Sequence, residues 1–124
     1  MKSIPQISEA ELEVMKILWE LGSATSAQII EQLCCTTDWK PKTIQTLITR
    51  LTAKEAIGAE KTSGKAFVYT PLVAEEAYKA HANQSFLQKL YKGSLNLMVT
   101  SFLKEKKLSK EEIEALKKLL EEEM

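Results

Sequence analysis

The hydrophobic period of the chain changes once within the first 72 residues, from helical spacing to alternation. Three segments repeat apolar residues at helical spacing, and each begins with a helix-start signal: capping boxes at Ser8–Glu11 and Thr25–Gln28, and a proline at Pro41. Two short alternating segments follow, separated by a polar turn. Three helices followed by a hairpin form a winged helix-turn-helix, so the order of the periods predicts this fold.

The boundaries of these elements come from local start and stop signals. Gly22 ends the first apolar run, and Pro71 closes the second alternating segment. In the third helix four apolar residues have the spacing of one buried stripe: Ile44, Leu47, Ile48 and Leu51. We therefore expect a DNA-binding domain over residues 1–72, with helices at about 9–21, 26–34 and 41–54 and strands at about 56–61 and 66–72.

Residues 73–124 have helical character throughout, with helices expected at about 74–91, 94–106 and 110–123, so the fold class is mainly α. These helices carry more apolar side chains than a segment of this size encloses by itself. We expect them to form a helical dimerisation arm, in which a second copy of the chain covers Phe86, Leu90, Leu95, Met98, Phe102, Leu103, Ile113, Leu116, Leu119 and Leu120.

The charge of the chain is balanced overall but not locally. Its 17 basic and 17 acidic residues cancel at neutral pH, which argues against a protein that coats nucleic acid or anionic membrane indiscriminately. Residues 40–65 instead contain six basic and only two acidic side chains. This local excess coincides with the third helix and the hairpin, and it favours a confined footprint on double-stranded DNA.

The third helix is the expected DNA-reading element, because its buried stripe leaves polar and basic side chains on the other faces. Arg and Lys bond guanine, Gln pairs with adenine, and the methyl group of Thr packs on thymine. The candidate contacts on or beside this helix are Lys40, Lys42, Thr43, Gln45, Thr46 and Arg50. Lys61 and Lys65 of the hairpin are candidates for phosphate contacts. An ordinary solvated helix face is the alternative interpretation of the same pattern.

Five segments carry a resemblance to known proteins: DWKPKTIQTLITRL from residue 38, ISEAELEVMKILW near the start, FVYTPL in the second strand, SFLQKLYKGSLNLMV from residue 85 and LSKEEIEALKKLL near the end. Together these segments resemble the penicillinase and methicillin-resistance repressor family. The resemblance therefore covers essentially the whole chain. Lys40 departs from it, because relatives usually carry Ser at this position as the cap of the third helix.

The resemblance implies a homodimeric repressor that binds a dyad operator built on TACA/TGTA half-sites and controls β-lactam resistance genes or a related response. It also implies release by proteolysis, triggered through a membrane-bound sensor-protease. In the resembling repressors the cut falls at an Asn-Phe bond in the middle helix of the arm. The matching bond here is Ser101-Phe102, where the Phe is kept and the Asn is not.

Metal, cofactor and enzyme sites find little support in the residue inventory. Cys34 and Cys35 are adjacent, but the single histidine, His81, is distant in the sequence, so we expect a pair of packing thiols and no metal or cofactor. Trp19 and Trp39 are assigned to packing rather than to base stacking. The chain has no phosphate-binding glycine loop and no arrangement typical of a nucleophilic enzyme, so we expect no catalysis.

Two alternative functions remain beside the β-lactam response. One is a winged helix used as a protein-interaction module, which the zero net charge would tolerate. The other comes from the resembling family, which includes copper-responsive repressors with a C-terminal Cys-x-Cys tail, although this chain has no such tail. The N-terminal residues show no signal or transit pattern, so we expect a cytoplasmic protein.

Overall fold

The computed structural model describes residues 4–62, 64 and 66–123. The chain divides into two units, Met1–Ala80 and His81–Met124. In the described part of the first unit, three helices pack with a small antiparallel sheet: α1 (Glu9–Leu21), β1 (Ala24–Thr25), α2 (Ser26–Thr36), α3 (Pro41–Ala53), β2 (Ile57–Lys61) and β3 (Phe67–Pro71). This arrangement confirms the winged helix-turn-helix.

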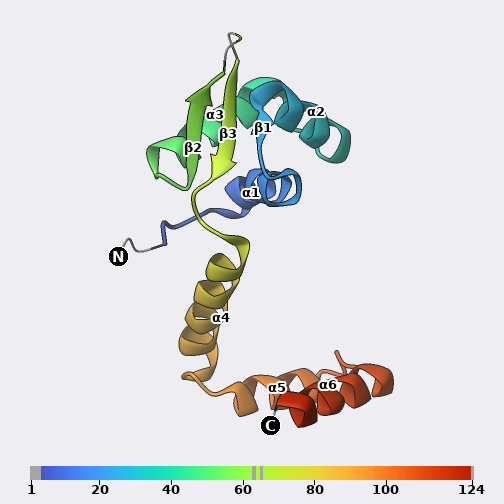
Figure 1. The fold of residues 1–124 in the computed structure, drawn as a ribbon. Coiled ribbons are helices and arrows are strands. Elements are labelled where there is room, and N and C mark those ends of the chain that lie inside the picture. Colours follow the sequence, from blue (N-terminus) through green and yellow to red (C-terminus); the bar gives the residue numbers. More distant parts are fainter. Residues whose placement is uncertain (1–3, 63, 65, 124) are drawn as a thin grey trace. The chain divides into compact units, whose positions relative to one another are not determined.

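The sheet has the order β1-β3-β2, with β3 in the middle (Figure 1). Strands β2 and β3 form the expected hairpin, in which Ala59 lies opposite Tyr69. Strand β1 was not expected, and it pairs Ala24 with Tyr69 across the other edge of β3. Its two residues are too few to display an alternating pattern.

Local capping chemistry explains where the first two helices begin. The Ser8 hydroxyl accepts a 3.1 Å hydrogen bond from the Glu11 amide, and Glu11 Oε1 accepts a 2.9 Å bond from the Ser8 amide. Thr25 and Gln28 exchange the equivalent bonds at 3.2 and 2.8 Å. Both predicted capping boxes are thus confirmed. Helix α2 ends at Thr36, slightly later than the expected end near Cys34.

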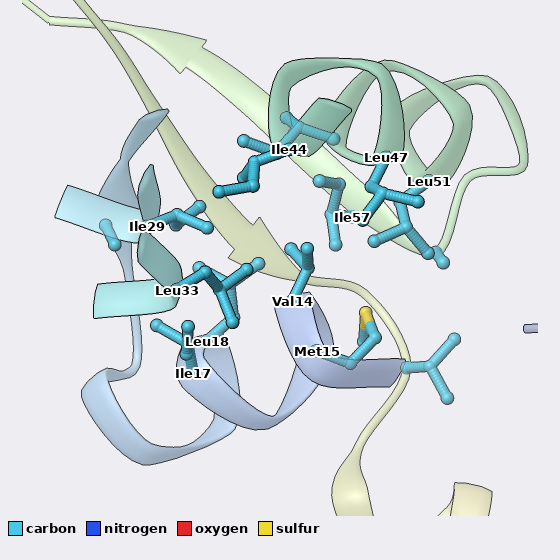
Figure 2. Packing of buried hydrophobic residues seen from close by; sticks show 14 residues of the cluster. Val14, Met15, Ile17, Leu18, Ile29, Leu33, Ile44, Leu47, Leu51 and Ile57 are labelled. Atoms are coloured by element: carbon cyan, nitrogen blue, oxygen red, sulfur yellow. The ribbon is translucent and has the colours of Figure 1, made fainter. Parts of the chain in front are cut away.

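The buried core of the first unit joins all three helices to the sheet. Figure 2 shows the side chains of α1, α2 and α3 converging with Ile57 of β2. All four residues of the predicted stripe on α3 are buried, and Ile44, Ile48 and Leu51 have no exposed surface. Trp19 and Trp39 are partly buried against this core, which confirms their packing role. The core therefore fixes which face of α3 remains open to a partner.

The first unit includes the start of α4 (Glu75–Tyr91), so the boundary between the units falls within this helix. The Trp19 indole donates a 2.8 Å hydrogen bond to the Val73 carbonyl, and its ring lies 5.6 Å from that of Tyr78 between centroids. These contacts attach the first turn of α4 to α1.

The second unit contains the rest of α4, together with α5 (Leu95–Lys104) and α6 (Lys110–Glu123), as expected. Ser94 caps α5 by accepting a 3.1 Å bond from the Leu97 amide. Ser109 and Glu112 exchange capping bonds of 3.0 and 3.1 Å before α6. No residue of α4 or α5 is buried. These helices thus form without enclosing a core of their own.

Candidate nucleic-acid interface

Helix α3 presents one continuous polar face opposite its buried stripe. Lys42, Gln45, Thr46, Thr49 and Arg50 lie at i, i+3, i+4, i+7 and i+8, which places them on the same side of a helix, and all five are exposed. Thr43 is also exposed and lies beside this face. The spacing of the core residues therefore brings together every candidate on α3.

Two threonines of this face are bonded within the helix. Thr46 Oγ1 donates to the Lys42 carbonyl at 3.0 Å, and Thr49 Oγ1 donates to the Gln45 carbonyl at the same distance. Although its hydrogen is already donated, each hydroxyl can still accept a hydrogen bond through its oxygen. Each threonine also carries a methyl group. In this rotamer Thr46 suits a base amino group or a thymine methyl better than a phosphate, which offers no donor.

Lys40 is the N-cap residue of α3, but its side chain makes no capping hydrogen bond. Pro41 at the first helical position removes one amide that would otherwise need a partner. The Lys40 side chain is exposed at the N-terminal end of α3 and is thus available to a phosphate or a base. Lys40 therefore places a positive charge at the start of α3 but supplies no side-chain cap.

The loop before α3 is held by a small hydrogen-bond network. The Thr37 hydroxyl donates to the Leu33 carbonyl at 2.7 Å and accepts a 3.2 Å bond from the Trp39 amide. Cys34 Sγ donates to the Trp39 carbonyl at 3.6 Å. Because Trp39 also packs on the core, this loop fixes the point at which α3 starts.

One of the six basic side chains counted in residues 40–65 is paired with a buried carboxylate. Lys54 Nζ lies 2.5 Å from Glu11 Oε1 and donates a 2.8 Å bond to the Gln6 carbonyl. The Lys54 side chain is 36% exposed, whereas that of Glu11 is only 2% exposed. This lysine therefore adds little to a DNA footprint. The sequence predicted Glu11 as a capping residue but carried no local sign of this pairing.

The environment of Glu11 stabilises its charged form. Burial alone would raise the pKa of Glu11, but hydrogen bonds from Lys54 and the Ser8 amide, together with the Lys54 charge, hold that pKa below its ordinary value of 4.5. The carboxylate is thus an internal anchor between α1 and the end of α3.

The hairpin contributes one described candidate. Lys61 is exposed at the end of β2, opposite Phe67 of β3. Lys65 lies outside the described residues. Among the residues that the structure describes, Lys40, Lys42, Arg50 and Lys61 form no ion pair. Their charges are therefore not neutralised within the described part of the chain.

The ten candidate dimerisation residues all lie in the second unit, on α5, on α6 or on the part of α4 after His81. Seven are exposed: Phe86, Leu90, Leu95, Leu103, Leu116, Leu119 and Leu120. Met98, Phe102 and Ile113 are half-buried. Leu97, which the sequence analysis omitted, is 52% exposed and extends this apolar surface on α5. Ser101 is half-buried and lies 3.5 Å from the Tyr91 hydroxyl, oxygen to oxygen.

The two cysteines are free and exposed, so their assignment as packing thiols is wrong. The buried residues of α2 are Ile29 and Leu33, and the positions after Leu33 turn toward solvent. No group of three or more potential metal ligands occurs among the residues that the structure describes. Within the same residues, no helix is long and apolar enough to cross a membrane.

Comparison with known proteins places this geometry among bacterial repressors. The sequence model of the penicillinase repressor family matches residues 7–122. The penicillinase repressor of Bacillus licheniformis is 48% identical over 122 residues, covering 98% of this chain and 94% of that protein. Methicillin resistance regulatory protein MecI of Staphylococcus aureus (strain N315) is 44% identical over 115 residues, covering 93% of each chain.

A solved structure resembles the first unit. It is the solution structure of Bacillus licheniformis BlaI in its monomeric form in complex with the blaP half-operator. The two chains are 50% identical and align with a TM-score of 0.55, over 63% of this chain and 94% of that one.

Proposed function

The chain belongs to the penicillinase repressor family, and we propose that it binds a dyad operator as a homodimer and thereby represses antibiotic-resistance genes. Proteins of this family are transcriptional repressors rather than enzymes. The observation that carries the proposal is the polar face of α3, which stands opposite a fully buried stripe in a fold shared with a repressor solved on its half-operator.

The N-terminal part of α3 is assigned to recognition of the operator bases. We assign base contacts to Lys42, Thr43 and Thr46, because the N-terminal part of a recognition helix enters the major groove. Gln45 and Arg50 reach further bases or phosphates from the same face. Lys40, Lys61 and Lys65 are assigned to the phosphate backbone, which fixes register without reading sequence.

We assign dimerisation to residues 73–124 and operator binding to residues 1–72. The support is the seven exposed large apolar side chains among the candidates, at positions where a monomer gains nothing from them. A second copy that covers these side chains gives the dimer the symmetry of a dyad operator. The target is double-stranded DNA, so the protein is assigned to the cytoplasm.

A titration of the purified chain with two labelled duplexes tests operator binding. One duplex carries the TACA/TGTA half-sites, and the other carries the same bases in scrambled order. We expect tight binding to the first duplex only, with an affinity that falls steeply as salt rises, because bound lysines and arginines release counterions. No binding to either duplex, or binding that salt leaves unchanged, would favour the protein-interaction module instead. Equal, salt-dependent affinity for both duplexes would refute sequence-specific operator binding.

Induction is assigned to a cut at the Ser101-Phe102 bond by a membrane-bound sensor-protease of the β-lactam response. The bond lies inside α5, so cleavage requires local opening of this helix. The cut separates Phe102, Leu103 and α6 from the rest of the arm. Loss of dimerisation then weakens operator binding on the order of 10²–10⁴-fold, because two linked half-site contacts act at high effective concentration.

Mapping of repressor fragments in β-lactam-treated cells tests this assignment. After exposure to a β-lactam, mass spectrometry is expected to reveal a fragment ending at Ser101 and its complement beginning at Phe102. A Ser101→Asp variant, which changes the cleaved bond and leaves the ten dimerisation residues in place, serves as the matched control and is expected to resist cleavage. A full-length repressor in cells that already express the target genes would exclude proteolytic release.

A further inference from the structure

The adjacent pair Cys34-Cys35 is not explained by the function proposed above. These are the two cysteines of the whole chain. Both are free and exposed, and both lie in the last turn of α2, which ends at Thr36. Neither contributes to the buried core. A reagent in solution can therefore reach two thiols at consecutive positions.

The turn that carries the cysteines also positions the recognition helix. The Thr37 amide and hydroxyl both donate to the Leu33 carbonyl, at 2.8 and 2.7 Å. The Thr37 hydroxyl in turn accepts from the Trp39 amide, and Cys34 Sγ donates to the Trp39 carbonyl. The residue after Trp39 is Lys40, the N-cap of α3. The backbone at Cys34 and Cys35 is thus directly connected to the start of α3.

The surface beside Cys35 is open on the other side of this turn. A shallow hollow is lined there by Leu21, Gln28, Glu31, Gln32, Cys35 and Thr36. Cys34 instead contacts the loop at Trp39. The two thiols therefore have different neighbours, although they follow each other in the chain.

We propose that Cys34 and Cys35 form a reversible modification site for low-molecular-weight disulfides, and that a disulfide closed between them weakens operator binding. The effect on DNA rests on the proposed function, whereas the modification itself does not. The site has the two thiols that such a reaction needs, and it adjoins the loop that fixes α3.

The reaction proceeds by two thiol-disulfide exchanges. One cysteine thiolate attacks a sulfur of the reagent R–S–S–R, which forms a mixed disulfide and releases RS⁻. The second cysteine, as its thiolate, attacks the protein sulfur of that mixed disulfide and releases the second RS⁻. In total two protein thiols are oxidised to one disulfide, one reagent disulfide is reduced to two thiols, and the two protons pass to the released thiolates.

The intact helix does not accommodate this product. Consecutive Cα atoms lie about 3.8 Å apart across a trans peptide, whereas disulfide-linked Cα atoms usually lie roughly 4.4–6.8 Å apart. The disulfide is therefore strained in any backbone conformation. Neighbouring side chains of a helix also point about 100° apart, so closure requires the backbone of the last turn of α2 to move and loosens the bonds from Thr37 to Leu33. A strained, exposed disulfide is readily reduced, so the modification is reversible.

The test starts from the fully reduced chain, whose affinity for the TACA/TGTA duplex is measured first. The chain is then treated with oxidised glutathione and separated from the reagent. Intact mass reports the modification, and a second titration reports the affinity. Variants Cys34→Ser and Cys35→Ser, which retain one thiol each, are carried through the same steps, and circular dichroism checks that both fold.

We expect each wild-type chain to lose the mass of two hydrogen atoms. We expect the operator affinity to fall about tenfold, because the loop that orients α3 has lost its supporting turn. A reducing thiol is expected to restore both values. Neither variant is expected to form the internal disulfide. A stable glutathione adduct, a disulfide between two chains, or an internal disulfide that leaves affinity unchanged would overturn the inference. If the reduced chain does not bind the operator, the proposed function fails. Intact mass still decides whether the disulfide forms.

Discussion

Glu11 and Lys54 are 43 residues apart in the chain, yet Nζ of Lys54 lies 2.5 Å from Oε1 of Glu11. The contact joins the first turn of α1 to the C-cap of α3. Lys54 also holds the Gln6 carbonyl, so the segment that precedes α1 is attached at the same point. The end of the recognition helix is therefore fixed by a charged pair and not only by apolar packing.

The depressed pKa of Glu11 predicts acid sensitivity. A group whose folded pKa is lowered stabilises the folded state fully above its unfolded pKa, here about 4.5, and loses this contribution as pH falls through the folded pKa. The free energy of unfolding should thus decrease when the pH is lowered beyond about 4.5. A Glu11→Gln variant, which keeps a capping oxygen, should lose about 1–2 kcal/mol at pH 7 and flatten this dependence. Urea unfolding at several pH values measures both; equal slopes in the two proteins would contradict the assignment.

The uncapped start of α3 predicts a stabilising substitution. Lys40→Ser supplies a side-chain acceptor for the free amides of the first turn and should raise the free energy of unfolding by about 0.5–2 kcal/mol. It also removes a charge assigned to the phosphate backbone in each of the two bound chains, so the slope of log affinity against log salt concentration should become shallower by about two. Lys40→Ala is the matched control, because it removes the charge without adding a cap. If both variants have the same stability, the introduced serine does not act as a cap.

The polar face of α3 predicts where DNA affinity resides. Arg50→Ala or Lys42→Ala should each weaken operator binding by about 1–3 kcal/mol per half-site if the lost contact is a bidentate base contact, and the dimer should stay intact. Lys16 is a suitable control, because it is exposed on α1 and pairs with Glu13 at 3.0 Å. Anisotropy titrations should show little change for Lys16→Ala. Unchanged affinity in both α3 variants would refute the assignment of this face.

The apolar surface of the arm predicts a dimer that a single charge disrupts. Leu90 on α4 is 63% exposed, and Leu90→Asp should weaken the dimer by about 10- to 100-fold if that side chain is covered by a second copy. Leu21→Asp provides the comparison, since Leu21 is 44% exposed on α1 in the first unit. Sedimentation equilibrium measures both dissociation constants. Equal constants for the two variants would place the interface elsewhere.

The sequence predicted those parts of the fold that depend on local signals. Both capping boxes lie within four consecutive residues, and the stripe on α3 repeats within a few turns, so neither needs knowledge of distant contacts. Strand β1 has only two residues and takes its conformation from pairing with β3, which no local period records. The pairing of Glu11 with Lys54 was missed for the same reason.

The candidate site was predictable to the extent that it lies on one helix. The spacing of Ile44 to Leu51 determines which face of α3 is open, so the polar candidates could be named in advance. The cysteines were misassigned because free cysteine is usually buried. The signal to correct this was present, since a helix that buries Ile29 and Leu33 turns the two following positions away from the core.

The distance between the two half-sites of the operator tests directly whether the repressor binds DNA as a dimer. Two duplexes are compared, one with half-sites about one helical turn apart, roughly 10 bp between centres, and one with half a turn inserted between them. We expect two chains per duplex on the first, and loss of tight binding on the second because the half-sites then face opposite sides of the DNA. Equal affinity for both duplexes would show that the chains bind as independent monomers.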